Sequence, residues 1–198
     1  MQHPNKILKN FKRLHLLYEE GAVFTAFDTE TTSLTPTTGR IIEIGAVKFS
    51  KNGIIDKWGQ LINPQTDIPP FITSLTHITN QMVSSCNPIS FFLPDFLNFI
   101  SDTILIAHNA QFDLNFLNAE CEKAGFSVTS NKTIDTLQFS RFAYPKVPKH
   151  KLDYLADYFK INKGSSHRAL DDALTCRELF IKCLYPVSSS CEELLQGL

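Results

Sequence analysis

Residues 41–62, IIEIGAVKFSKNGIIDKWGQLI, decide how the fold of this 198-residue chain begins. Two runs of strand-forming side chains, 41–49 and 54–62, flank the pair Asn52-Gly53. An Asn-Gly pair between two such runs is typical of a tight β-hairpin turn. The run at 22–29 predicts one more strand before the hairpin. The three strands together predict an antiparallel meander that opens a sheet.

The rest of the chain alternates between helical and strand patterns. Residues 103–107, TILIA, predict a short buried parallel strand. Helices are expected at 5–19, in short pieces across 70–83, and at 88–100, 110–123, 135–142, 151–159 and 168–184. This order predicts an α/β sheet layered by helices.

The same patterns divide the chain into three parts. We expect an N-terminal amphipathic helix in residues 1–20, one globular domain over 21–185, and a short flexible tail over 186–198. The N-terminal helix either packs on the domain or docks a partner, and packing at home is the commoner use of such a helix.

Composition narrows the class of protein. Apolar residues make up 43% of the chain and charged residues 20%, which is ordinary for a soluble domain. The net charge of −1 gives no overall attraction to nucleic acid, so any such contact must come from a local site or from bound cations. The five scattered cysteines form no C-x-x-C pair, and neither a signal peptide nor a membrane span is evident. We therefore expect a cytoplasmic protein with reduced thiols and no membrane partner.

Four carboxylates stand inside or beside apolar runs, where an unpaired charge is costly. Asp28 and Glu30 lie in AFDTETTSL (26–34), Asp113 in AHNAQFDLNFL (107–117), and Asp172 in HRALDDALTC (167–176). No comparable run of lysine or arginine accompanies them. The pattern predicts a divalent cation site, and two ions fit four carboxylates better than one.

The first two stretches place their carboxylates by local geometry. Asp28 and Glu30 are two residues apart on a strand, so both leave the same face. Asp113 stands near the start of a helix, on the side of Phe116 and Leu117, and Asn109 is expected to cap that helix. Taken alone, Asp28 and Glu30 could equally be surface acids at the end of a strand rather than metal ligands. Asp113 alone could equally be a negative charge that matches the positive end of a helix.

The third stretch contains two adjacent aspartates, and helical periodicity separates them. Asp171 begins a polar stripe, whereas Asp172 begins an apolar stripe and therefore points inward. We assign the site to Asp172. His167 stands five residues earlier, so it must precede the helix if it is to reach the same site. A histidine there is suited to accept a proton from an attacking water.

In order along the chain, these stretches resemble the motifs of the DEDDh family of 3′-to-5′ exonucleases. FDTETTSL matches the first motif of that family, AHNAQFDLNFL the second, and HRALDDA the third with its histidine. LTHITNQMV, at 75–83, resembles the segment between the first two motifs. The likeness covers roughly residues 22–184 and is strongest to the group around the epsilon proofreading subunit of bacterial DNA polymerase III. Three motifs in order are far more specific than any one alone.

The resemblance implies a ribonuclease H-like fold, with a mixed five-stranded sheet of meander and parallel strands flanked by helices; residues 21–185 would then be the exonuclease domain. It also implies that Asp28, Glu30, Asp113 and Asp172 hold two Mg²⁺ or Mn²⁺ ions, with His167 as general base. In this scheme one ion lowers the pKa of a water, and the resulting hydroxide attacks the terminal phosphodiester in line. The second ion stabilises the departing 3′ oxygen, and a nucleoside 5′-monophosphate is released.

The substrate implied by the family is the 3′ end of DNA, single-stranded or frayed. Thr31, Thr32 and Leu34 would bind the terminal nucleotide, with Leu34 as a wedge. Asn109 joins them as a candidate, although the residues around it argue only for a structural role. Ser33 stands where the family usually has glycine, so the backbone of that loop is expected to differ slightly.

A DNA polymerase subunit is a candidate partner, although only about a dozen residues follow the last expected helix, too few for the tethering extension of epsilon. Residues 138–142 only loosely resemble a clamp-binding peptide. Three alternatives stay open: an RNA-trimming exonuclease of the same superfamily, a nuclease-like module that binds without cutting, and a structural magnesium site.

Overall fold

The computed structural model describes residues 6–165 and 167–196, with side chains up to residue 186. In this part of the chain, one mixed sheet of six strands has the order β1-β6-β5-β2-β3-β4. The strands are β1 (Lys6–Ile7), β2 (Phe24–Thr31), β3 (Ile41–Ser50), β4 (Gly53–Leu61), β5 (Ile104–Ala107) and β6 (Lys132–Asp135). The β2–β3–β4 pairs are antiparallel, and the pairs β2–β5, β5–β6 and β1–β6 are parallel.

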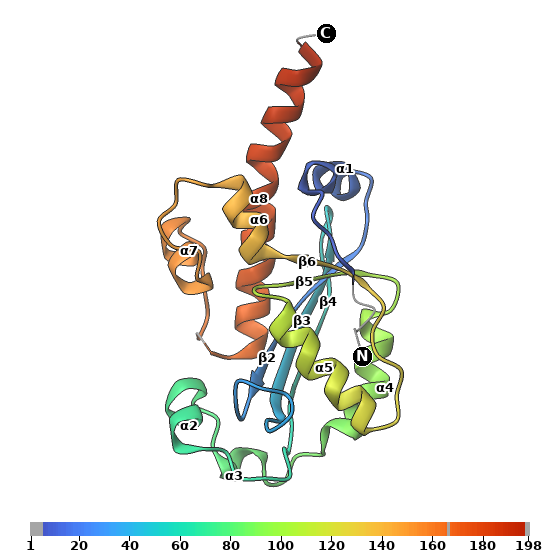
Figure 1. Cartoon of the computed structure of the whole chain (residues 1–198), viewed down its shortest axis with the longest axis vertical. Helices are drawn as coiled ribbons and strands as arrows, with labels where there is room; N and C mark the ends of the chain where they lie inside the picture. The colour runs from blue at the N-terminus through green and yellow to red at the C-terminus, as the bar shows by residue number, and fades with distance from the viewer. Residues whose placement is uncertain (1–5, 166, 197–198) are drawn as a thin grey trace.

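Helices cover both faces of this sheet (Figure 1). They are the 3₁₀ turn η1 (Phe11–Arg13) and the α-helices α1 (Leu14–Glu19), α2 (Pro70–Thr76), α3 (Asn80–Val83), α4 (Ile89–Ile100), α5 (Gln111–Lys123), α6 (Thr136–Ala143), α7 (Leu152–Tyr158) and α8 (Ala169–Gln196). The predicted α/β class and the meander with its turn at Asn52-Gly53 are confirmed. None of the described helices combines the length and the apolar character that crossing a membrane would need.

Two apolar clusters lie on opposite faces of β2. Phe24 and Ala26 belong to the cluster under α6, α7 and α8, whereas Phe27 belongs to the cluster under α4 and α5. Side chains alternate along a strand, so the face of each residue on β2 is fixed by its parity. Asp28 and Glu30 consequently leave on the α8 face, and Thr29 leaves on the α5 face.

The prediction of one helix over 5–19 is confirmed only in its second half, where η1 and α1 together cover residues 11–19, and it is wrong at its start. Lys6 and Ile7 form β1, which pairs in parallel with β6, and the backbone N–H of Leu8 donates to the carbonyl of Thr133 at 2.8 Å. The edge of β6 offers unpaired backbone groups, and pairing with them outweighs the helical spacing of the apolar side chains. Leu8 and Phe11 still pack into the cluster under α8.

The same pairing explains why the sheet has six strands rather than five. β6 is only four residues long and runs directly into α6, which matches the helix predicted at 135–142 within one residue, whereas the strand itself was not predicted. A strand this short has too few residues to show an alternating pattern.

The last helix is longer than predicted. α8 continues to Gln196, past the expected end at 184, with Pro186 inside it. Proline removes one backbone hydrogen bond but allows a helix to continue on either side of it. Up to residue 196, the predicted tail over 186–198 is therefore helical in its backbone; residues 197 and 198 lie outside the described part. In Figure 1, α8 extends well past the sheet.

The N-terminus of α8 lies directly against β3. A side chain at Gly45 would overlap the backbone nitrogen of Leu170 and the carbonyl carbon of Ala169, so only glycine permits this approach. Gly45 pairs across the sheet with Asp28 on one side and with Gly59 on the other. The close contact therefore sets the height of α8 above Asp28.

Replacing Gly45 tests whether this contact positions the helix. We expect Gly45→Ala to lower the free energy of unfolding in urea by about 1–3 kcal/mol, the usual cost of overpacking, because two backbones must separate. Gly59→Ala is the matched control, since its methyl group would lie 3.6 Å from the Leu170 side chain, an ordinary contact. Equal unfolding midpoints for the two variants would contradict the argument.

Candidate active site

Strand β2 presents two carboxylates to α8. Asp28 lies opposite Gly45 and Glu30 lies opposite Glu43 on β3. The predicted shared face of Asp28 and Glu30 is confirmed by the alternation along the strand. A register shift follows between Glu30 and Thr31, and there the chain leaves the sheet.

Thr29, between the two acids, points the other way and holds Asp113. Its backbone N–H and its Oγ1 both donate to Asp113 Oδ1, at 3.0 Å and 2.8 Å. Asp113 stands in the first turn of α5 and is 2% exposed. The predicted inward orientation of Asp113 is therefore confirmed. Asp28 and Glu30 point to the α8 face of the sheet, and Thr29 between them binds Asp113 on the α5 face.

Asn109 does not cap α5, contrary to the prediction. Ala110 occupies the cap position and makes no side-chain cap bond. Asn109 adopts φ +65°, a left-handed conformation that asparagine tolerates, and its backbone N–H donates to Asp135 Oδ1 at 3.0 Å. Asp135 closes this turn from β6, which the periodicity of the α5 segment alone could not reveal.

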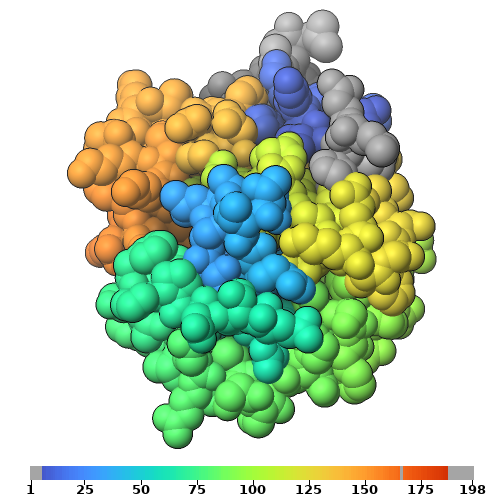
Figure 2. All heavy atoms as spheres, turned by 60° about the horizontal axis from the view of Figure 1, so that its bottom comes forward, coloured from blue at the N-terminus to red at the C-terminus, as the bar shows by residue number. Residues whose placement is uncertain are grey.

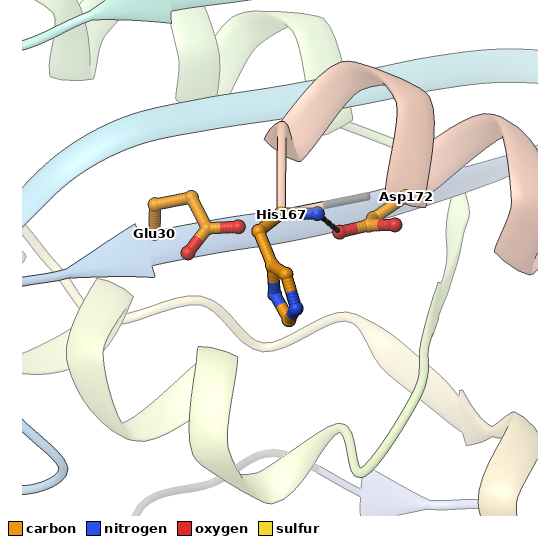
Figure 3. A group of neighbouring side chains, drawn as sticks. All are labelled: Glu30, His167 and Asp172. Atoms are coloured by element: carbon orange, nitrogen blue, oxygen red, sulfur yellow. Dashed lines mark hydrogen bonds between the residues drawn. The ribbon is translucent and has the colours of Figure 1, made fainter. Parts of the chain in front are cut away.

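The third segment brings His167 and Asp172 to Glu30 (Figure 3). His167 precedes α8 with φ +61°, and its backbone N–H donates to Asp172 Oδ2 at 2.9 Å. One potential ligand atom from each of Glu30, His167 and Asp172 lies within 4.8 Å of the other two. The prediction that His167 lies before the helix and near Asp172 is confirmed; Ser166, in the turn expected before it, is outside the described residues.

Asp171 faces another way, although it is not the freely solvated acid that was predicted. Its Oδ2 accepts the backbone N–H of Ser165 at 2.8 Å, and a side chain at Gly164 would overlap its carboxyl group. The next residue of its stripe, Thr175, is buried and donates to the Asp171 carbonyl at 2.9 Å. Asp171 therefore holds the loop before α8, while Asp172 faces the cavity.

A fifth carboxylate, Glu43, fastens the start of α8. Arg168 donates to Glu43 Oε1 through its guanidinium at 2.8 Å, and the backbone N–H of Ala169 donates to Oε2 at 2.9 Å. Glu43 is thus fully engaged, although it lies opposite Glu30. Sequence reasoning missed both Glu43 and Arg168, because β3 and α8 are 125 residues apart in the chain.

Burial raises the pKa of each of the remaining four carboxylates, and nearby acids add to the effect. For Asp28, burial raises the pKa well above its ordinary value, and Asp113, Glu30 and Asp172 add to the effect. Burial first, and then Asp172, raises the pKa of Glu30 to about 8. Burial raises the pKa of Asp113 to about 7 despite the Thr29 hydrogen bonds, and that of Asp172 to about 6. A buried, crowded set of oxygen ligands is what a hard divalent cation such as Mg²⁺ would stabilise.

All four carboxylates and His167 line one cavity of about 550 Å³. Its other lining residues are Thr29, His108, Asn109, Phe112, Leu137, Arg141, His150, Lys151, Leu152 and Asp153. Arg141, His150 and Lys151 come from the α6–α7 segment, to which the sequence analysis assigned no role. The only sequence signal for them was the basic run at 146–151, KVPKHK.

Of the predicted substrate residues, Thr31, Thr32 and Leu34 are not among those that line this cavity. Asn109 lines it. Thr31 and Thr32 are buried: Thr31 Oγ1 donates to the Ser33 carbonyl at 2.7 Å, and Thr32 Oγ1 accepts the N–H of Arg40 at 2.9 Å. Leu34 is 79% exposed. Figure 2 looks onto this end of the molecule, where the 31–40 segment, in blue, lies between the teal α2–α3 and orange α6–α7 segments.

Comparison with known proteins finds the same fold and closely similar sequences. The family described as RNase_T: Exonuclease matches residues 25–180. The DNA polymerase III subunit epsilon of Treponema pallidum is 43% identical over 163 residues, covering 81% of this chain and 76% of the relative. The DNA polymerase III PolC-type of Caldanaerobacter subterraneus is 43% identical over 161 residues, so this chain spans 11% of that relative's length.

A solved structure supports the fold independently. The nuclease domain of 3′hExo, a DEDDh family member bound to rAMP, superposes with a TM-score of 0.72 at 21% identity, over 83% of this chain and 92% of that one. The ribonuclease H-like fold expected from the sequence is thereby confirmed.

The raised pKa values predict how stability depends on pH and on magnesium. Between its ordinary value of 4.5 and about 8, Glu30 keeps its proton in the folded state and loses it in the unfolded state. The metal-free fold should therefore lose stability as the pH rises through that range. Magnesium binds the ionised site, so the rise in melting temperature that it causes should grow from pH 6 to pH 8.5, by about 2–4 °C for each kcal/mol of linkage.

Differential scanning fluorimetry with 10 mM MgCl₂ or with chelator measures this directly. Glu30→Gln should melt higher than wild type without metal at pH 8.5, because the charge is gone, and should respond little to magnesium. A magnesium effect that is the same at every pH would contradict the assignment of these carboxylates to a cation site.

Proposed function

The chain belongs to the exonuclease family, and on that basis we propose that it removes nucleoside 5′-monophosphates from the 3′ ends of DNA, single-stranded or frayed. The observation that carries this proposal is the convergence of Asp28, Glu30, Asp113, Asp172 and His167 on one cavity. The PolC-type relative is about nine times longer than the matched region, so the proposal does not extend to the activity of that whole protein.

The donor set at the site fits divalent cations. Asp28, Glu30, Asp113 and Asp172 would hold two Mg²⁺ or Mn²⁺ ions, because carboxylate oxygens are the ligands these ions prefer. When bound, the ions would lower the pKa of an attacking water and stabilise the departing 3′ oxygen.

The protein's own groups would orient the reaction. Thr29 fixes Asp113 with two hydrogen bonds, so this carboxylate cannot rotate away from the cavity. The His167 backbone bond to Asp172 and the left-handed φ at His167 hold the imidazole at the cavity, next to Glu30. From there His167 would take the proton of the attacking water as general base.

Substrate and partner contacts belong to the same proposal. Residues 31–34 and Asn109 would contact the terminal nucleotide, with Leu34 exposed enough to act as a wedge. A DNA polymerase would be the partner of a proofreading enzyme, as the name of the Treponema pallidum relative suggests. Residues 21–185 would form the exonuclease domain of a cytoplasmic protein.

Paired aspartate variants test the proposal. With 5′-labelled DNA and RNA oligonucleotides, magnesium and wild-type protein, we expect a ladder that shortens from the 3′ end and disappears with chelator. Asp172→Asn should lose about 10²-fold or more of the rate, the scale of a lost catalytic group, whereas Asp171→Asn, which keeps an acceptor for Ser165, should stay near wild type. Equal loss in both variants would contradict the assignment of Asp172, and faster shortening of RNA would change the substrate class.

His167 has a separate test. Asparagine tolerates left-handed backbone, so His167→Asn removes the imidazole without new strain. We expect kcat to fall about 10²–10⁴-fold while the magnesium-dependent rise in melting temperature is kept. Loss of the magnesium effect would instead make His167 a metal ligand.

A further inference from the structure

The cavity is lined by basic as well as acidic residues. Arg141 in α6, together with His150 and Lys151 before α7, lines the same cavity as the four carboxylates, and we call these three residues the basic wall. Among the side chains that the structure describes, up to residue 186, neither Arg141 nor Lys151 has a carboxylate within ion-pair distance. The one acid on this side, Asp153, lies 3.7 Å from Lys163. The cations are therefore available to a ligand.

A partly buried histidine fixes the basic wall to the sheet. His108 follows β5, and its Nε2 lies 2.8 Å from the His150 carbonyl while its Nδ1 lies 3.0 Å from Thr136 Oγ1. A carbonyl can only accept, so Nε2 carries the proton. Burial lowers the pKa of His108, which keeps the ring neutral, and Nδ1 contacts a Thr136 hydroxyl that also donates to the Ala107 carbonyl at 3.3 Å.

His150 is held from its other side as well. Ser140 Oγ donates to the Leu137 carbonyl at 3.0 Å and lies 2.9 Å from His150 Nδ1. Because the hydroxyl proton is already used, Nδ1 donates to Ser140, and the Nε2 edge of His150 is left for the cavity. The wall is thus preorganised by bonds to β5 and α6.

Basic and aromatic side chains continue past the wall. Lys149 Nζ lies 5.9 Å from the centre of the Tyr154 ring, and Tyr154 stacks on Tyr158, which is 54% exposed. Alternating cations and aromatic rings are the usual surface for a single nucleic-acid strand, where phosphates meet the charges and bases stack on the rings. With a net charge of −1, the chain offers this combination locally and not as a general field.

We propose that the basic wall binds the phosphates on the 5′ side of the scissile bond in a single DNA strand. This inference rests on the proposed exonuclease function. The scissile phosphate belongs to the carboxylates, which would hold the metal ions of the reaction. Arg141 and Lys151 line the same cavity from a different segment and are therefore left for other phosphates. Arginine is suited to grip a phosphate through two parallel hydrogen bonds, and lysine supplies a point charge.

The test couples charges on the protein to charges on the DNA. Arg141→Ala/Lys151→Ala would be compared with wild type on a single-stranded oligonucleotide and on the same oligonucleotide with uncharged methylphosphonates at the second and third linkages from the 3′ end. Both substrates keep the terminal linkage that is cleaved. In wild type, the methylphosphonates should raise KM about three- to fivefold for each lost contact, and in the double variant they should change it little.

A charge-matched control separates local contacts from net charge. Arg13→Ala/Lys57→Ala removes the same two charges from exposed positions outside the cavity lining, and it should keep the wild-type response to methylphosphonates. The double variant should also lower the slope of log Kd against log salt by about 0.7 for each phosphate released, measured by fluorescence anisotropy with Ca²⁺ in place of Mg²⁺.

Each outcome has one meaning. Equal methylphosphonate effects in wild type and in Arg141→Ala/Lys151→Ala would overturn the phosphate-binding role of the wall. If wild type shortens neither DNA nor RNA under any metal, the proposed exonuclease function fails instead. A lower kcat on the p-nitrophenyl ester of thymidine 5′-monophosphate, which lacks the further phosphates, with unchanged coupling would assign the wall to the reaction centre and also overturn the inference.

Discussion

The contact between the start of α8 and β3 is the constraint on which the site depends. The two residues of β3 opposite Asp28 and Glu30 are Gly45 and Glu43. Gly45 has no side chain, so the helix can approach, and Glu43 accepts from the backbone N–H of Ala169 at 2.9 Å, so the helix is held there. Asp172 is three residues further on, close to one helical turn, and therefore reaches the carboxylates of the neighbouring strand. Without this pair on β3, the third motif would lie near the first only by chance.

A second constraint is electrostatic. Bringing four carboxylates together lowers the stability of the metal-free fold when they are ionised, as their raised pKa values indicate. Thr29 holds Asp113 in the group with two hydrogen bonds. Such an arrangement is unfavourable until positive charge enters, so cation binding and folding stability are linked. Among the side chains that the structure describes, the four carboxylates also form no ion pairs that could replace a bound cation. No lysine or arginine of the described residues lies within ion-pair distance of any of them.

The periodicity of the sequence located the site residues but did not reveal the distant residues that hold them in place. The two-residue spacing of Asp28 and Glu30 and the apolar stripe of Asp172 were enough to place these three side chains correctly, because each argument concerns a single element. Asp171, predicted to be solvated, instead binds the loop before α8. The cap of α5, the strand at Lys6–Ile7 and the Glu43 bond to α8 all depend on partners far along the chain. One sequence contains no record of such partners, which is why Asn109 was misread and Glu43 was overlooked.

The basic wall was not predicted from the sequence for the same reason. Its position explains how a nuclease without net positive charge could bind DNA. A chain with a net charge of −1 cannot gather DNA by a general field. The His108 bond to the His150 carbonyl holds a basic loop at the cavity that the four acids line, so attraction of the strand and activation of the water would occur in one cavity through different segments. The carboxylates alone would repel a strand, and the wall alone would bind it without cutting. Because the wall reads phosphates and not base edges, a strand of any sequence can advance by one nucleotide and meet the same contacts.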